Sequence, residues 1–256
     1  MTATDTTDAH RGTLWLFATF VLFAGAALLL HGPIPQDPSY HAFADARTLF
    51  GVPHFWNVVS NLPFVVAGLA GRYTLRVRPP GVLPELRTAY AALFVGSMLV
   101  GVGSGAYHLA PSNETLVWDR LPMTLGFMAF VAILIGEHVS PAFARRALLP
   151  LVLLGAGAVA WWARTDDLRP YALVQFAPVL LLPVLLLRHP SRLDTIAPLW
   201  LVLASYVVAK LLEHWDDALL AALGFSGHPL KHLAASVAIF AMVYAMRRRV
   251  RVPVDS

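Results

Sequence analysis

Eight long apolar blocks constrain the fold of this 256-residue chain more than any other feature of its sequence. The first runs from about 14 to 30, and the others lie near 55–71, 89–109, 120–137, 147–163, 171–187, 197–213 and 229–246. Blocks of roughly 17–25 residues have the length at which a helix crosses a bilayer core about 30 Å thick. Because a backbone in lipid must satisfy its own hydrogen bonds, each block is expected to be an α-helix.

Composition also favours a membrane over water as the main solvent. Hydrophobic residues make up 57% of the chain and charged residues only 13%, whereas a typical soluble domain carries about 25% charge. The basic net charge of +4 does not indicate a nucleic-acid partner, because the arginines flank apolar blocks, as residues that orient membrane spans do. We predict an all-α polytopic membrane bundle whose partner is the bilayer. Its oligomeric state is left open.

The Lys and Arg residues predict the orientation of the spans. Thirteen of the nineteen fall in the N-terminal segment, the second, fourth and sixth loops and the C-terminal segment, and six fall on the opposite side. Cytoplasmic loops carry the excess of basic residues, which places both termini in the cytoplasm. We therefore expect a multi-pass protein of the cell membrane with an even number of spans.

A pair of histidines marks the start of the last block. The chain has no cysteine, so a metal site must use histidine or carboxylate ligands. His228 and His232 stand four residues apart, and residues i and i+4 share one face of a helix. Pro229 suits the first helical position, where no N–H is required. The pair is predicted to point one way from a helix start, where it can chelate a metal ion.

A third histidine reaches the same membrane face. His108 ends the third block, and eight spans threaded from a cytoplasmic N-terminus bring that end and the start of the last span to the outer side. Three protein ligands with water in the fourth position are typical of catalytic zinc. The sequence thus predicts a Zn²⁺ site toward the outer face, held by His108, His228 and His232. Other histidines are expected to be solvated in tails, loops or helix ends: His10, His31, His41, His138 and His189.

Two polar residues are expected near this site. Asp119 begins the fourth block on the outer side, and Ser104 lies one helical turn before His108. A polar group at membrane depth that faces a cavity is a functional candidate. The alternatives are a helix cap or an Arg120 pair for Asp119, and a small packing residue for Ser104. A further cluster at 210–217, in which Lys210 and Glu213 can pair, either supports the metal ligands or is a solvated helix end.

Four segments, taken in order, resemble the alkaline ceramidase family. They are SNLPF after an aromatic-Asn step, GSGAYH, WDRLPM eleven residues beyond that histidine, and HPLKH. The resemblance runs from about Tyr40 to Arg247 and extends to a superfamily that includes adiponectin-receptor-like proteins. It implies a seven-helix core, a zinc site and hydrolysis of a sphingolipid amide. By motif it assigns His108, His228 and His232 to the metal, and Ser104 and Asp119 to catalysis.

The chain also departs from this pattern, and the departures refine the predicted organisation. Eukaryotic ceramidases have an acidic calcium site before the first core helix, but His54 stands at a glutamate position and Asp45 is the one acid of the preceding segment. This argues against calcium and favours a bacterial-type member. The predicted segments are a cytoplasmic tail at 1–13, an extra transmembrane helix at 14–31, an outer loop at 32–54, the ceramidase-like core at 55–246 and a basic cytoplasmic tail at 247–256.

Alternatives remain for the first block and for the function. A signal peptide would also begin with an apolar block, but only Arg11 precedes this one and no clear cleavage site follows it. The leading functional hypothesis is a zinc amidohydrolase whose substrate is a ceramide-like or other N-acyl lipid. A receptor or scaffold with a structural zinc would use the same ligands. A transporter would need a polar path through the inner halves of the spans, which are almost wholly apolar.

Overall fold

A computed structural model describes residues 22, 25–26 and 30–252. The predicted tail at 1–13, nearly all of the extra transmembrane helix at 14–31 and the last four residues of the basic tail lie outside these residues. The elements of the core are α2 (Phe55–Val59), α3 (Leu62–Arg76), α4 (Arg87–Leu109), α5 (Asn113–His138), α6 (Pro141–Thr165), α7 (Arg169–Arg188), α8 (Ala197–His214), α9 (Asp216–Leu223) and α10 (Gly227–Arg248), with short 3-10 turns η1 (Pro38–His41) and η2 (Pro84–Leu86).

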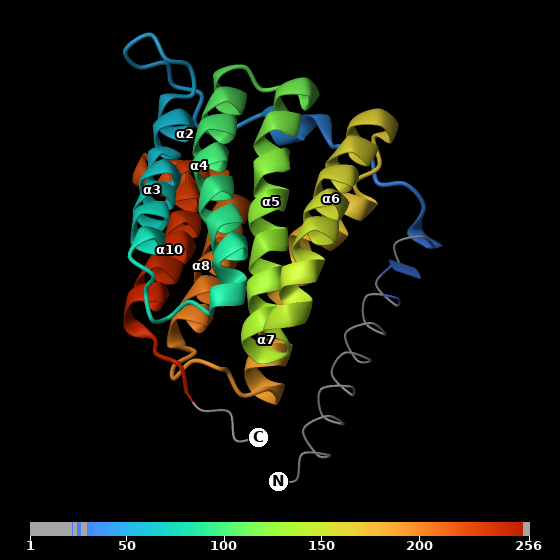
Figure 1. Cartoon of the computed structure of the whole chain (residues 1–256). Helices are drawn as coiled ribbons and strands as arrows, with labels where there is room; N and C mark the ends of the chain where they lie inside the picture. The colour runs from blue at the N-terminus through green and yellow to red at the C-terminus, as the bar shows by residue number, and fades with distance from the viewer. Residues whose placement is uncertain (1–21, 23–24, 27–29, 253–256) are drawn as a thin grey trace.

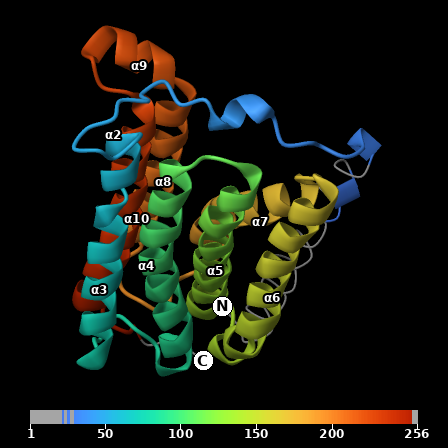
Figure 2. The ribbon, with the colours of Figure 1, turned by 90° about the horizontal axis from the view of Figure 1, so that it is seen from above.

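The helices form a bundle in which α3, α4, α5 and α6 follow one another in a row (Figure 1). Behind this row, α10 packs against both α3 and α8, and α7 packs against α5 and α6. Turned by 90°, the same bundle shows α9 lying across one end beside α8 and α10 (Figure 2). The upper end in Figure 1 holds the outer loop, the end of α4 and the start of α5, and the lower end holds the loops after α3, α5 and α7.

Among the described residues, six helices are long and apolar enough to cross a membrane: α4, with the turn before it, and α5, α6, α7, α8 and α10. The block predicted near 55–71 is divided, because α2 ends at Val59 and α3 begins at Leu62 and runs for 15 residues. Large apolar side chains such as Leu69 and Leu149 are exposed on the outside of the bundle. An exposed apolar surface of this kind suits contact with lipid, and the chain is a multi-pass membrane protein.

Two helices, α5 and α6, start six or seven residues before their predicted apolar blocks, because polar caps fix their first turns. Ser112 and Thr115 form a reciprocal capping box at the start of α5: the Ser112 hydroxyl accepts from the Thr115 N–H at 3.2 Å, and the Thr115 hydroxyl accepts from the Ser112 N–H at 3.0 Å. Ser140 caps α6, with Pro141 in its first turn. Such caps satisfy N–H groups that have no partner within the helix. Asp119 consequently lies in the second turn of α5.

A buried ion pair ties the lower end of the bundle together. Arg249 and Glu137 are fully buried, with 2.8 Å between Nη1 and Oε2, and the Tyr90 hydroxyl donates to Glu137 Oε1 at 2.6 Å. The group joins α4, α5 and the residue that follows α10. Arg249, expected in the basic tail, is therefore part of the core.

Removing the charge of Glu137 is expected to destabilise the bundle strongly. Glu137→Gln keeps the shape of the side chain but leaves Arg249 without its counter-charge, which typically costs about 3–5 kcal/mol. The measurement is denaturant unfolding of the purified protein in detergent. Glu85→Gln, at an exposed acid of the lower end, is the matched control and should shift stability by less than about 0.5 kcal/mol. Equal stability of the two variants would contradict this account of the pair.

The sidedness of the membrane is a separate prediction. Basic residues concentrate in the loops of the lower end, so that end is expected to face the cytoplasm. Arg78 follows α3 at the lower end, and Asn113 begins α5 at the upper end. Reporters fused at these two positions should give opposite signals, cytoplasmic at Arg78 and external at Asn113. The same signal at both positions would refute the predicted topology.

Candidate metal centre and lipid cavity

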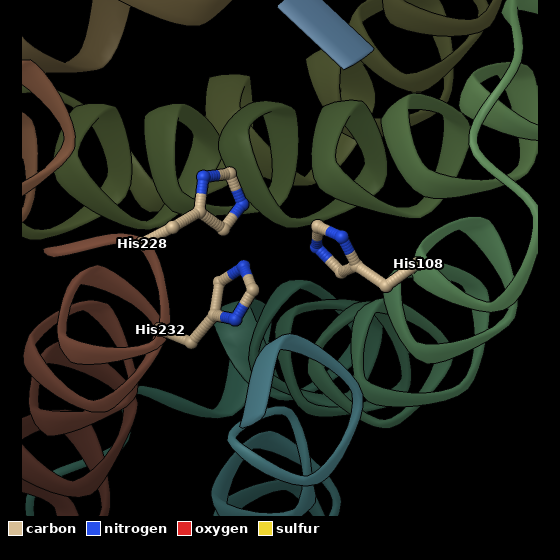
Figure 3. A group of neighbouring side chains, drawn as sticks. All are labelled: His108, His228 and His232. Atoms are coloured by element: carbon tan, nitrogen blue, oxygen red, sulfur yellow. The ribbon is translucent and has the colours of Figure 1, made fainter. Parts of the chain in front are cut away.

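Three buried histidines converge at the upper end of the bundle. His108 comes from the last turn of α4, and His228 and His232 come from the first turns of α10 (Figure 3). Their ring centroids lie 4.9–5.1 Å from one another. One ligand nitrogen can be chosen from each ring so that all three lie within 4.8 Å of one another. The arrangement therefore allows three nitrogens to bind a single metal ion.

Asp216 fixes the start of α10 and with it the backbone of the histidine pair. The helix begins at Gly227, two residues earlier than the sequence predicts, so Pro229 is the third rather than the first helical residue. Its missing N–H is still harmless there, because the first four N–H groups of a helix have no partner within it. The N–H of His228 instead donates to the Asp216 carboxylate at 2.7 Å. A polar residue of the 210–217 cluster thus supports a candidate ligand.

Neighbouring side chains orient the imidazoles. The Ser60 hydroxyl lies 2.8 Å from His232 Nδ1, which leaves Nε2 as the nitrogen available to a metal. The His54 ring lies 2.9 Å from the His108 carbonyl oxygen. Phe43, from the outer loop, packs edge-on against both His108 and His228, with centroids 4.6 and 4.5 Å away. Side chains that contact metal ligands commonly hold those ligands in place. Phe43 also covers two of the three rings.

The polar atoms left without partners fit a metal. Among the described residues, His108 Nδ1 and His228 Nε2 are buried and have no hydrogen-bond partner. A buried polar atom without a partner is costly, and a metal ion would satisfy both nitrogens. Three imidazoles match the number and type of protein ligands at a catalytic Zn²⁺ site, which keeps its fourth position for water. The residues present therefore fit the ion that the sequence predicts.

Ser104 and Asp119 are brought to the same region. Both are buried, and both line the same cavity as His232. Gly103 lets α4 and α5 approach closely here, because a side chain at this position would collide with the Trp118 backbone of α5. Ser112, not Asp119, is the cap of α5, and Asp119 forms no ion pair with Arg120, which instead bonds to Gln36. The geometry therefore disfavours the two structural alternatives for Asp119.

A cavity of about 420 Å³ extends from these residues into the bundle. Its polar end includes Ser104, Asp119 and His232, and its deeper walls include apolar residues such as Leu93, Leu182 and Met242. Ligand sites commonly combine a largely apolar wall with a few placed polar groups. This cavity has the character expected for an acyl chain whose polar end lies beside the histidines.

The 210–217 cluster and the outer loop contain further partners. Lys210 pairs with Glu213 at 2.6 Å, as the i, i+3 spacing predicts, and Glu213 also pairs with Lys231 of α10.

In the outer loop, Asp45 is buried against Arg47, and the hydrogen bonds from Arg47 hold the pKa of the Asp45 carboxyl below its usual range. This carboxylate is therefore ionised and engaged within the loop that covers the site.

Sequence reasoning missed three supporting residues and misjudged two histidines. Nothing in the sequence indicates that Phe43, His54 and Ser60 contact the histidine cluster, because their contacts cross between segments; only Ser60 lies in a recognised motif, SNLPF. Asp216 takes the supporting role that was one of the two alternatives for the 210–217 cluster. The prediction that His138 and His189 are solvated is wrong, since both are buried at the lower end. The chain segment after α7 folds over the end of α5 there, and His138 bonds to the His189 carbonyl.

Comparison with known proteins agrees with this fold and these motifs. The family model described as Ceramidase matches residues 51–216, which is more than half of the chain. Alkaline ceramidase 3 of Mus musculus is 33% identical over 84 residues, which cover 33% of this chain and 29% of that protein. The aligned region is thus less than a third of the relative's length. The family match and the ordered motifs lead to one conclusion: the chain belongs to the ceramidase family.

Proposed function

We propose that this protein is a zinc-dependent membrane amidohydrolase that cleaves the amide bond of a ceramide-like or other N-acyl lipid. The observation that carries the proposal is the convergence of three buried histidines, one of which, His232, lines an apolar cavity together with Ser104 and Asp119. Family membership supports the amide as the bond that is broken. The acyl chain would lie in the apolar part of the cavity, with the scissile amide beside Asp119.

The residues of the chain divide the chemistry between them. When bound, zinc supplies a Lewis acid that lowers the pKa of water and polarises a carbonyl oxygen. The Asp119 carboxylate accepts the proton of the attacking water and passes it to the amide nitrogen as the C–N bond breaks. The Ser104 hydroxyl orients Asp119 or donates a hydrogen bond to the developing oxyanion. Water adds to the carbonyl carbon, so the products are a fatty acid and a free amine.

A receptor or scaffold with a structural metal is the alternative. Structural zinc sites usually have four protein ligands, whereas the cluster among the described residues contains three. Release of fatty acid from N-acyl lipids by the purified, metal-loaded protein distinguishes the two functions, with ceramides tested first. Hydrolysis of at least one amide lipid supports the enzyme. A metal-loaded protein that hydrolyses none of them would favour the receptor-like alternative.

A further inference from the structure

The polar end of the cavity carries more cations than carboxylates. Its walls include three cationic side chains, Arg120, Lys210 and Lys231, and two carboxylates, Asp119 and Glu213. The two lysines share the single Glu213 carboxylate, Lys210 from the same helix, α8, and Lys231 from α10. One positive charge of this trio is therefore uncompensated, in a place where charge is costly unless it is paired or functional.

Arg120 adds a second cation without an ionic partner. Its guanidinium lies against three aromatic rings, with centroids 4.1 Å (Trp162), 4.7 Å (Tyr171) and 5.5 Å (Tyr40) away. Nη2 donates to the neutral Gln36 side chain at 2.6 Å, and Nη1 is buried without a partner among the described residues. Aromatic faces stabilise a cation but do not neutralise it, so this charge remains available to an anion in the cavity.

Both cations lie near the group proposed to act on the amide. Lys231 is next to His232 in α10, and it lines the cavity together with Asp119 and Arg120. Tyr40, whose ring centroid is 5.5 Å from the Arg120 guanidinium, lines the same cavity, so both cations belong to its polar end. A headgroup attached to an amide beside Asp119 would lie between them, since the acyl chain fills the apolar part.

We propose that the preferred substrate is an anionic N-acyl lipid, with a carboxylate or phosphate on the amine side of the scissile amide that binds Lys231 and Arg120. This inference rests on the proposed amidohydrolase function. A neutral headgroup would leave the excess positive charge of this end uncompensated, whereas an anion forms charge-assisted hydrogen bonds with Lys231 and Arg120. A carboxylate and a phosphate both supply what this site requires, a negative charge close to the amide.

The test compares substrates that differ in this charge. N-oleoylglycine and N-oleoylethanolamine have the same acyl chain and amide, and they end in a carboxylate and a hydroxyl. The wild-type kcat/KM is expected to favour N-oleoylglycine by about 10- to 100-fold, as for one hydrogen bond to a charged group. A second comparison, ceramide 1-phosphate against ceramide, tests a phosphate in place of the carboxylate. A preference for the anionic lipid in one comparison identifies which anion the site binds. No preference for the anionic lipid in either comparison overturns the proposal.

Substitutions at Lys231 assign the preference to this site. Lys231→Gln should bring the anionic-to-neutral ratio close to one, mainly through KM, and Lys231→Arg should restore most of it. A ratio unchanged in Lys231→Gln would show that the anion binds elsewhere and would overturn the proposal. If Lys231→Gln does not fold, the wild-type ratio and the Lys231→Arg ratio still decide.

A binding measurement separates this inference from the proposed function. Binding of the same two lipids to the Asp119→Asn protein, measured by equilibrium dialysis in detergent, does not depend on turnover. Tighter binding of N-oleoylglycine than of N-oleoylethanolamine supports the anion site even if no lipid is hydrolysed. Equal binding together with hydrolysis of neutral amides would refute the anion site and leave the amidohydrolase proposal intact.

Discussion

Replacing Asp119 with asparagine is expected to lower the turnover of a lipid amide by about 10²–10⁴-fold, the usual contribution of general acid–base catalysis. The substitution keeps the size of the side chain and removes the group that accepts a proton. Asp119 does not belong to the cluster of candidate metal ligands, which consists of three histidines. The metal content and the folding of the variant should therefore stay at the wild-type level. The measurement is fatty-acid release, with metal content determined on the same preparation.

Two further variants show whether the effect belongs to Asp119. Asp217→Asn removes an exposed carboxylate from the same end of the bundle and should leave turnover unchanged. Ser104→Ala should lower turnover less than Asp119→Asn, or by up to about 10²–10³-fold if the hydroxyl holds the oxyanion. Full activity of Asp119→Asn with its metal in place would remove Asp119 as the base.

Removing a histidine of the cluster is expected to abolish metal binding and activity together. His232→Ala deletes a ligand that two other rings cannot replace, and Ser60→Ala deletes only the hydroxyl that holds the His232 ring at 2.8 Å. Loss of such an outer partner typically lowers metal affinity by about 10–100-fold, so His232→Ala should lower it by more. Because metal binding couples to folding, the thermal midpoint should fall with the metal content.

The graded order of these effects is the informative result. His214→Ala changes an exposed histidine at the same end and should retain metal and stability. In a metal titration of the three variants, metal affinity should be highest for His214→Ala, intermediate for Ser60→Ala and lowest for His232→Ala. A His232→Ala protein that binds metal as tightly as the wild type would place the site elsewhere.

The bundle was largely predictable because lipid leaves the backbone few options. Long apolar blocks indicated helices, whereas the polar caps Ser112 and Ser140 moved the starts of α5 and α6 outward. The division of the 55–71 block was not predicted. SNLPF places Ser60 and Asn61 between α2 and α3, and there the Ser60 side chain bonds to His232 of α10. The break between α2 and α3 thus carries a hydrogen bond across the bundle, at a point where hydropathy predicted one continuous span.

The site was predictable where spacing and topology act together. The i, i+4 spacing of His228 and His232, and the face that His108 reaches, were enough to expect the observed cluster. The residues that cover and hold it depend on tertiary packing more than on local pattern. Phe43 of the outer loop is of this kind, whereas Asp216 of α9 lies in the 210–217 cluster, for which a supporting role was one of two alternatives. The buried pair of Glu137 and Arg249 was missed for the same reason, since each residue looks like a solvated helix end.

The most direct test of the central claim is to follow metal content and fatty-acid release on one preparation while a chelator removes the metal and zinc is then restored. If the three histidines hold a metal on which amide hydrolysis depends, we expect about one metal ion per chain, activity that falls in proportion to metal content, and recovery when zinc is added. Hydrolysis that persists after complete metal removal, or a His108/His228/His232 triple alanine variant that retains its metal, would contradict it.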